Sequence, residues 1–497
     1  MNDLAYTRRS AIFGRQGEDP GASGGDVDRK DARVKPRRMH SRRPSSVATR
    51  PGQNLPPMHD VPGLSIAHKF LLPLLFLVLG AAGATRAELT IEIVGGQEGA
   101  QPIAVAPFGL QGGGGLPQED LAQVIAADLA RTGRFKPLPR QEMPAAPQSF
   151  EEVDLRDWRL LAMNNLVAGQ VTRRPDGYYE VQFALFDVYS GEQLANMSLP
   201  SSAADLRHTA HRIADIVYER LTGLPGAFTS RLAYVTSEWG VDGQRVTLRV
   251  ADADGHNPQT IVSSKEPLLS PAWSPDGRRL AYVSFEDRHT AIFVQELATG
   301  RRERVASFPG INSAPAWSPD GGRLALTLSK DGNPEIYVLD LGTRALRRLT
   351  DHPGIDTEPA WSPDGSEIFF TSGRGGDPQI YRMPIHGGEA TRVTFERDYN
   401  GRPSLSPDGR SLVMVTRVNG QFRIALMDLA SQGTRLLSRG GLDESPSFAP
   451  NGSMVIYATQ SNGRGVLAVV STDGKVGQRL SQDAGEVREP AWSPPSR

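Results

Sequence analysis

The sequence predicts a six-bladed β-propeller that follows a small α/β domain. The string Ala-Trp-Ser-Pro-Asp-Gly occurs at 272–277, 316–321 and 360–365, and weaker copies follow at 405–409, 448–452 and 492–494. Counted from the tryptophan position of each copy, successive copies lie 44, 44, 44, 43 and 44 residues apart. A constant period of this size is typical of a four-stranded propeller blade repeated along the chain.

Each repeat has the pattern of four short strands separated by turns. In the copy beginning at 315, apolar strands are predicted at 315–318, 324–328, 336–340 and 346–350. Pro, Asp and Gly at 319–321 form a turn, because Pro fixes φ while Asp and Gly tolerate left-handed conformations. The same pattern fits 360–394, 403–438 and 446–481, so the whole region 231–497 is predicted to be all-β.

The two ends of this region complement each other. Residues 231–236 have the pattern of a second strand with no first strand before it, and 491–494 that of a first strand with no second strand after it. Joined, they complete one blade, which predicts a ring closed by strand exchange between its ends. Closure of this kind also hides strand edges that would otherwise invite aggregation.

Because strand direction alternates within a blade, the Pro-Asp-Gly turns fall on one face of the ring. The loops that join a fourth strand to the next first strand fall on the other face, which we call the channel mouth. They are 268–271, 311–315, 355–359, 399–403, 442–446 and 486–490. Function on rigid scaffolds is commonly carried by such loops.

Polar and charged side chains gather in the channel-mouth loops, although the repeat itself does not require them. They are Asn312, Asp356, Thr357, Glu358, Asn400, Arg402, Asp443, Glu444, Arg488 and Glu489. A ring of mixed charge suits an extended peptide or a loop of a partner protein. A solvated rim without a partner is the alternative that residue types alone leave open.

Residues 88–226 lack the repeat and alternate strand and helix signals. Strands are predicted at 89–94, 103–107, 166–171 and 179–189. Apolar residues at helical spacing predict helices over 119–132 and from 206 to Gly223, which would end the second helix in the left-handed conformation. A short linker, 224–227, joins this domain to the propeller and leaves little room for independent motion.

The first 87 residues have the composition of a tail followed by an export signal. Residues 1–57 carry twelve Lys and Arg against six Asp and Glu and are rich in Gly, Pro and Ser, so they are predicted to be disordered. The apolar run 70–80 within 58–87 indicates a secretory signal peptide cleaved between Ala87 and Glu88. An internal signal also suggests that translation begins at Met39 or Met58.

The charge of the mature chain argues against some partners. Residues 1–87 carry about +7 of a total of −1, which leaves about −8 for 88–497. A mildly acidic protein is unsuited to nucleic acid or an anionic lipid surface. The chain has no cysteine, which excludes disulfides and thiol nucleophiles.

Other chemical motifs are weak. His208 and His211 stand one helical turn apart, but no third ligand lies near them in sequence, so no metal site is predicted. The nucleophile-elbow pattern at 21–25 lies in the basic tail, and the Gly run 112–115 lacks the Lys of a phosphate loop. The Asp residues of the turns and Trp273, Trp317 and Trp361 are predicted to be structural. No catalytic residue, cofactor or metal is therefore expected.

The combination of these features resembles the TolB family, periplasmic proteins of the Tol–Pal cell-envelope system of Gram-negative bacteria. Besides the repeated turn string, the segments that carry the resemblance are 168–172, 221–223, 226–228, 442–446 and 490–494. It covers 88–497 and implies a non-enzymatic periplasmic adaptor, a monomer in isolation with no membrane span. The system that it implies maintains outer-membrane integrity and acts in constriction at cell division.

The resemblance also implies partners and sites. The lipoprotein Pal would bind the channel mouth, with Ile311, Ala314 and Thr357 among its contacts, and colicin-type peptides would use the same channel. Family members have His where this chain has Ile311, so an apolar anchor is expected there. TolA would bind the first mature residues, docked between the domains or released: Glu88, Leu89, Thr90, Ile91, Glu92, Ile93 and Val94. The alternatives are a propeller-gated peptidase or other hydrolase and a sensor of a small ligand.

Overall fold

The computed structural model describes residues 89–93, 99–111, 119–144, 147, 149–481 and 485–495. The predicted tail 1–57, the signal peptide 58–87 with Ala87, and the residues Glu88 and Val94 lie outside these ranges. The elbow pattern at 21–25 and the Gly run 112–115 lie outside them too. The described residues form an α/β domain and a six-bladed propeller, which confirms the predicted fold class.

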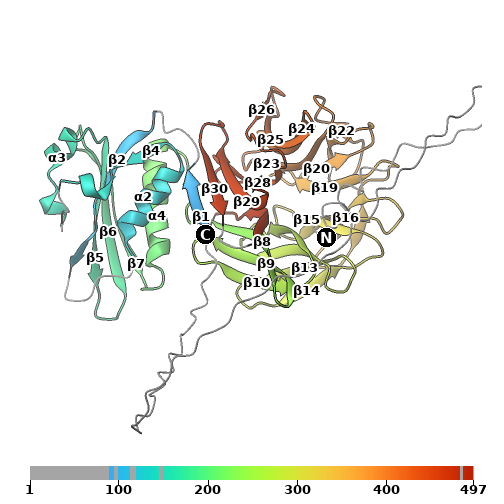
Figure 1. Cartoon of the computed structure of the whole chain (residues 1–497), viewed down its shortest axis with the longest axis horizontal. Helices are drawn as coiled ribbons and strands as arrows, with labels where there is room; N and C mark the ends of the chain where they lie inside the picture. Colours follow the sequence, from blue (N-terminus) through green and yellow to red (C-terminus); the bar gives the residue numbers. More distant parts are fainter. Residues whose placement is uncertain are drawn as a thin grey trace, which may run out of the picture. The chain divides into compact units, whose positions relative to one another are not determined.

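The α/β domain is built on a mixed sheet with the order β4-β2-β5-β6-β7, and β3 pairs with β5. Its strands are β2 (Gln101–Val105), β3 (Gly109–Gln111), β4 (Phe135–Pro137), β5 (Asn165–Arg173), β6 (Tyr179–Asp187) and β7 (Gln193–Ser201). Its helices are α2 (Leu121–Arg131), α3 (Leu155–Leu160) and α4 (Leu206–Thr222), with 3₁₀ turns η1 (Arg140–Glu142) and η2 (Phe150–Glu152). Helices α2 and α4 lie side by side (Figure 1).

Alternation along β2 places its side chains on the two faces of this sheet. Ile103 and Val105 pack with α2 and α4 in one core, and Ala104 packs with Trp158 of α3 in another. The helix predicted from 206 ends at Gly223, which has φ 72° as expected. Helix α3 and strands β4 and β7 were not predicted, because these short or mainly exposed segments carry little periodicity.

Across the described residues the propeller consists of six sheets. The blade that joins the two ends contains β31 (Glu486–Trp492), β8 (Arg231–Gly240), β9 (Gly243–Asp252) and β10 (Gln259–Ser264). The second contains β11 (Leu268–Trp273), β12 (Arg279–Ser284), β13 (Ala291–Glu296) and β14 (Arg302–Ala306). The third contains β15 (Asn312–Trp317), β16 (Arg323–Leu328), β17 (Glu335–Asp340) and β18 (Leu346–Arg348).

The remaining blades follow the same order. The fourth contains β19 (Asp356–Trp361), β20 (Glu367–Ser372), β21 (Gln379–Pro384) and β22 (Thr391–Arg392). The fifth contains β23 (Asn400–Leu405), β24 (Ser411–Val418), β25 (Gln421–Asp428) and β26 (Thr434–Leu436). The sixth contains β27 (Glu444–Phe448), β28 (Met454–Ser461), β29 (Arg464–Ser471) and β30 (Gly477–Ser481).

The ring closes as the sequence predicts. Strand β31 pairs antiparallel with β8, with Trp492 opposite Leu232 and Glu486 opposite Ser237. The pairing joins segments about 250 residues apart in the chain, so β31 completes the blade that begins with β8.

The turn string proves to be scaffold. In the copy at 316–321 the Ser318 hydroxyl donates to Asp320 and accepts from the Arg323 amide, and Asp320 accepts from the Gly322 amide. The indole N–H groups of Trp273, Trp317 and Trp361 donate to carbonyls of the preceding blade at 3.0–3.1 Å. Both sets are therefore structural, as predicted.

The first described strand joins the propeller. We expected 89–94 to open the α/β domain, but β1 (Thr90–Ile93) pairs antiparallel with β30 as a fifth strand of the sixth blade (Figure 1). Leu89, just before it, is 4% exposed and packs in a core cluster with Leu232 and Ile456. The segment is thus held by strand pairing and by one buried apolar side chain.

The linker between the domains is fixed from α4. The Asp215 carboxylate accepts hydrogen bonds from the Phe228 and Thr229 amides at 2.7 and 3.2 Å and from the Thr229 hydroxyl at 2.7 Å. Gly226 passes so close to Asp215 that a Cβ there would lie 2.1 Å from a carboxylate oxygen. The closeness of this approach explains the glycine.

Candidate functional site at the channel mouth

Every blade has the same backbone irregularity at its channel-mouth end. The residue before the proline of each first strand has φ between 48° and 56°, and the register with the second strand shifts there. We call these six residues the axial ring: Ser270, Ala314, Glu358, Arg402, Ser445 and Glu489. The register shift marks a β-bulge, which re-aims the side chain of the strand that carries it.

A positive φ is unfavourable for these residue types. Non-glycine residues in the left-handed region cost of order 1–3 kcal/mol each, and such residues persist only where the surrounding structure imposes them. Here all six copies of the repeat impose it. Strain repeated at one end of the ring is a feature that commonly marks binding sites, so it directs attention to the side chains held there.

Arg402 is the centre of an ion-pair network within the axial ring. Its Nε lies 3.5 Å from a Glu358 oxygen and its Nη2 lies 3.3 Å from a Glu489 oxygen. Its Nη1 donates to the Ser445 hydroxyl. Glu489 belongs to a blade two places from that of Arg402, so these side chains meet across the mouth.

Backbone groups complete the network. The Arg402 amide donates to Glu358 Oε2 at 3.0 Å, and the Ser270 amide donates to Glu489 Oε2 at 3.0 Å. The Thr371 hydroxyl also donates to Glu358 Oε2 at 3.0 Å. Four of the six ring residues therefore make charged or hydrogen-bonded contacts to one another through these carboxylates.

The charges of this network favour a permanent cation surrounded by acids. Burial alone would lower the pKa of the Arg402 guanidinium, but the carboxylates of Glu489, Glu358 and Glu444 outweigh it and raise the pKa. The axial ring itself contains two acids, Glu358 and Glu489, and one arginine, so it has an excess of negative charge. A partner with a cationic or hydrogen-bond-donating loop would complement it.

Four of the predicted mouth residues are buried, and their side chains hold the loops. Asn312, Asp356, Asn400 and Asp443 are at most 1% exposed. Asn312 exchanges hydrogen bonds with the Phe308 backbone, and Asp443 accepts from the Ser438 and Thr459 hydroxyls.

The other two of these four have similar roles. Asn400 donates to Gln379 and to the Glu396 carbonyl, and Asp356 pairs with Arg374 at 2.7 Å. Burial raises the pKa of the Asp356 and Asp443 carboxyls. In this conformation none of the four offers surface to a partner. They were expected at the surface of the mouth because of their residue types, but their side chains hold the loops from within.

All but one of the remaining predicted residues keep accessible surface. Ile311, Ala314, Thr357, Glu358, Arg402, Glu444 and Arg488 are half-buried, whereas Glu489, a member of the axial ring, is buried. Arg488 pairs with Glu486 at 2.8 Å. The apolar residues Ile311 and Ala314 belong to the third blade. The charged residues Glu358 and Arg402 belong to the fourth and fifth blades, which follow it around the ring.

Comparisons with known proteins identify the family. A family model described as the TolB amino-terminal domain matches residues 89–194, and one described as the TolB beta propeller domain matches 218–496. The chain belongs to the TolB family. Its curated relatives are named "Tol-Pal system protein TolB", which also places this chain in the Tol–Pal system.

Two of these TolB relatives align with this chain over nearly their whole length. The protein of Nitrosococcus oceani is 62% identical over 409 residues, 82% of this chain and 94% of the relative. That of Thioalkalivibrio sulfidiphilus is 57% identical over 435 residues, 87% of this chain and 99% of the relative. The crystal structure of TolB from Acinetobacter baumannii matches with a TM-score of 0.76 and 42% identity, covering 82% of this chain and all of that one.

Some residues of this TolB-family mouth were missed from sequence. Ser270 and Ser445 belong to the axial ring, and the signal was available: each copy has its ring residue directly before a proline. Trp239 and Val241 at the tip of the β8–β9 hairpin are 64% and 106% exposed, and Phe395, in the loop before β23, is 62% exposed. The hairpin tip extends past Glu486, where β31 begins, and so lies at the channel-mouth end.

The two histidines considered in the sequence analysis differ in the structure of this TolB-family chain. The side chain of His208 is exposed, and its pKa is lowered first by partial desolvation and then by the nearby charge of His211. His211 is 2% exposed and lies with Asp128 and Asp254, which come from distant parts of the chain.

Among the described residues, no helix has the length and apolar character needed to cross a membrane.

Proposed function

We propose that this TolB-family chain is a periplasmic adaptor that binds the lipoprotein Pal at its channel mouth and TolA through its first mature residues. In this role it contributes to outer-membrane integrity and to constriction during cell division, without catalysing a reaction. The periplasmic location rests on the export signal expected at 58–87. Membership of the Tol–Pal system supports partners of this kind.

The axial ring is the observation that supports the mouth as the binding site. Six strained residues at one end of the propeller hold a charged network that the fold itself does not require. The accessible residues around it form the proposed Pal interface: Ile311, Ala314, Thr357, Glu358, Arg402, Glu444 and Arg488. Asn312, Asp356, Asn400, Asp443 and Glu489 would support this interface from beneath.

Strand β1 supports the N-terminal segment as the second binding element. It is the outermost strand of its sheet and pairs only with β30 among the described strands. A strand added at a sheet edge is held mainly by backbone hydrogen bonds, which another chain can replace by the same geometry. Glu88 to Val94 could then be docked on β30 in one state and offered to TolA in another.

Capture of Pal and TolA by the mature chain tests this proposal. We expect Ile311→Arg to weaken Pal binding about tenfold or more, because a charge would replace an apolar anchor at the mouth. Arg301→Glu is the matched control, because this exposed residue lies in the turn before β14, at the opposite end of its blade. Calorimetry or surface-binding measurements with purified Pal give the affinities.

The proposed binding of TolA needs a separate experiment. Removal of 88–94 should abolish TolA binding and leave Pal binding intact. Unchanged Pal affinity in Ile311→Arg and in Glu444→Lys would exclude the mouth as the site. Hydrolytic turnover that a single substitution abolishes would favour the hydrolase alternative, and a small molecule that competes at the mouth would favour the ligand sensor.

A further inference from the structure

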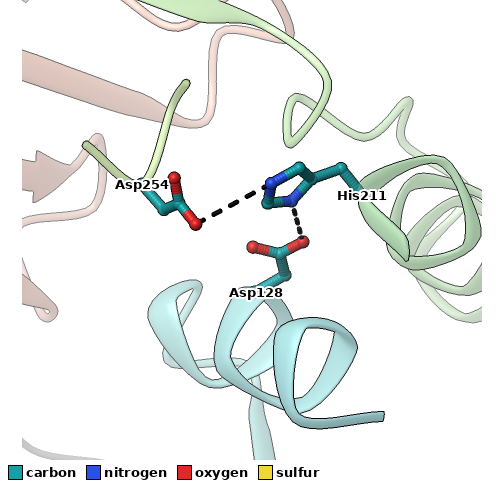
Figure 2. A group of neighbouring side chains, drawn as sticks. All are labelled: Asp128, His211 and Asp254. Atoms are coloured by element: carbon teal, nitrogen blue, oxygen red, sulfur yellow. Dashed lines mark hydrogen bonds and ion pairs between the residues drawn. The ribbon is translucent and has the colours of Figure 1, made fainter. Parts of the chain in front are cut away.

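A second buried cluster lies where the α/β domain meets the propeller. Figure 2 shows His211 of α4 between Asp128 of α2 and Asp254 of the loop after β9. Its Nδ1 lies 2.6 Å from Asp128 Oδ2, and its Nε2 lies 3.7 Å from Asp254 Oδ2. The first two residues belong to the α/β domain and the third to the propeller, so the imidazole spans the boundary.

Both carboxylates of this cluster also have an arginine partner. Arg131 pairs with Asp128, and Arg207 bridges Asp254 and Glu119. Three acids therefore face two arginines and one histidine. A protonated His211 would balance the charges.

The geometry disfavours a neutral imidazole. Nδ1 is at hydrogen-bond distance from a carboxylate, so it must carry the proton there, which leaves a lone pair on Nε2 directed at a second carboxylate. The other neutral tautomer, with its proton on Nε2, would place the Nδ1 lone pair 2.6 Å from the Asp128 carboxylate. Because His211 is 2% exposed, water cannot relieve either arrangement, and only the cation suits both neighbours.

These residue types can also bind metals, but the arginines oppose a cation here. The two arginines balance two of the three acids, so one positive charge on His211 completes the balance, whereas a divalent ion would leave an excess of positive charge beside Arg131 and Arg207. Among the described residues, Nε2 of His211 makes no hydrogen bond, and at 3.7 Å its contact with Asp254 is an ion pair when the ring is protonated.

The cluster adjoins the N-terminal segment on two sides. Gly255, next to Asp254, lies so close to Leu89 that a Cβ there would be 2.5 Å from Leu89 Cβ. On the other side, Gln478 of β30 donates to the Arg131 carbonyl, and Ile93 of β1 pairs opposite Gln478. The groups that hold the two domains together thus also contact the support of β1.

We propose that Asp128, His211 and Asp254 form a proton-sensitive latch that fastens the α/β domain to the propeller and thereby keeps the N-terminal segment docked. The latch needs only the contacts above. Its consequence for TolA rests on the function proposed in the preceding section. The charged or titratable groups around His211 are Asp128 and Arg131 from α2, Arg207 and His208 from α4, and Asp252 and Asp254 from β9 and the loop after it.

The direction of the pH dependence follows from the contacts. Burial lowers the pKa of His211, but the charge and hydrogen bond of Asp128 and the charge of Asp254 outweigh it and raise the pKa above 6.5. A group whose pKa is raised in the closed state stabilises that state at low pH and loses its contribution as pH rises through the raised value. The latch therefore holds below about pH 6.5 and loosens above it.

Amide hydrogen exchange on the mature chain, corrected for intrinsic rates, tests the latch. Between pH 5 and about 6.5 we expect constant protection of 89–93 and 252–256, and above that a fall of up to about tenfold per pH unit, the limit for one linked proton. Asp254→Asn and His211→Gln should both flatten this pH dependence. His208→Gln is the matched control, because it removes a histidine one turn away on α4 and should retain it.

Two results would overturn the proposal. One is a pH dependence of protection that persists in both His211→Gln and Asp254→Asn. The other is stoichiometric binding of Zn²⁺ alone that Asp254→Asn abolishes, which would make the cluster a metal site. Because His211→Gln could also impair folding, Asp254→Asn carries the test, with its melting temperature measured beside it. Loss of the latch with normal Pal and TolA binding would leave the proposed function standing.

Discussion

The axial ring and the interdomain latch are both charge clusters with limited access to solvent, but they are built differently. The ring uses one backbone position repeated in six blades, and its cation is an arginine that stays charged at every physiological pH. The latch takes one residue from each of three unrelated segments and places a histidine between two acids. The first arrangement gives a fixed surface, and the second gives a contact that pH can loosen.

This difference separates two tasks within one chain. A binding surface benefits from preorganisation, because groups already fixed lose little freedom when a partner binds. A release step needs two states that differ by only a few kcal/mol, biased by a local change in charge. The mouth has the first property and the boundary between the domains has the second.

The largest expected effect comes from removing the cation of the ring. Arg402→Met should lower the free energy of unfolding by about 3 kcal/mol, because it leaves Glu358 and Glu489 without their partner in a poorly solvated site. Urea unfolding followed by circular dichroism measures the change. The matched control, Arg488→Met, removes a more exposed cation of the same mouth and should cost under about 1 kcal/mol.

Equal losses in the two variants would contradict the comparison. In that case the network around Arg402 would be no more important than a surface ion pair, and the strain of the axial ring would need another explanation. The loss in Arg402→Met should also be nearly independent of pH between 6 and 8, in contrast to the latch.

The sequence predicted the propeller almost completely, because a period of 44 residues constrains every blade at once. Blade number, ring closure, turn aspartates and interblade tryptophans all follow from that period. The structure bears them out through the β31–β8 pairing and the indole hydrogen bonds. The helices α2 and α4 could be predicted because their apolar residues recur at helical spacing.

The sites were predicted only in part. Residue type could not distinguish Asp356 and Asp443, which hold loops from within, from Glu358 and Glu444, which keep surface, because all are acids of the same loops. The latch could not be found at all, since its three residues are separated by 83 and 43 positions and meet only after both domains fold. Pairing of β1 with the propeller was hidden for the same reason.

A smaller effect is expected where the N-terminal segment is anchored. Leu89→Ala should shift β1 toward release by about 2 kcal/mol, roughly thirtyfold in the docking equilibrium, because it empties a buried apolar position. Limited proteolysis at 89–100, or a label on a single cysteine introduced into this cysteine-free chain, measures release. The unfolding of the propeller itself should change little.

A drop in global stability with no increase in release would show that Leu89 belongs to the propeller core and not to a detachable segment. Leu160→Ala is the control, because that leucine is 86% exposed and lies on α3. Combined with Asp254→Asn, Leu89→Ala should release β1 less than additively, if both act on the same docked state.

The smallest effect on stability is expected at the exposed rim of the mouth. Trp239→Ala should leave the free energy of unfolding within about 0.5 kcal/mol, since the side chain is 64% exposed at a hairpin tip. It should nevertheless weaken Pal binding severalfold, because an exposed indole at the channel-mouth end resembles the aromatic anchors of protein interfaces. Chemical unfolding and calorimetry with Pal, with Tyr178→Ala as the exposed aromatic control on the α/β domain, separate the two quantities. Unchanged affinity in Trp239→Ala would confine the interface to the loops around the axial ring, and a loss in Tyr178→Ala would move it off the mouth altogether.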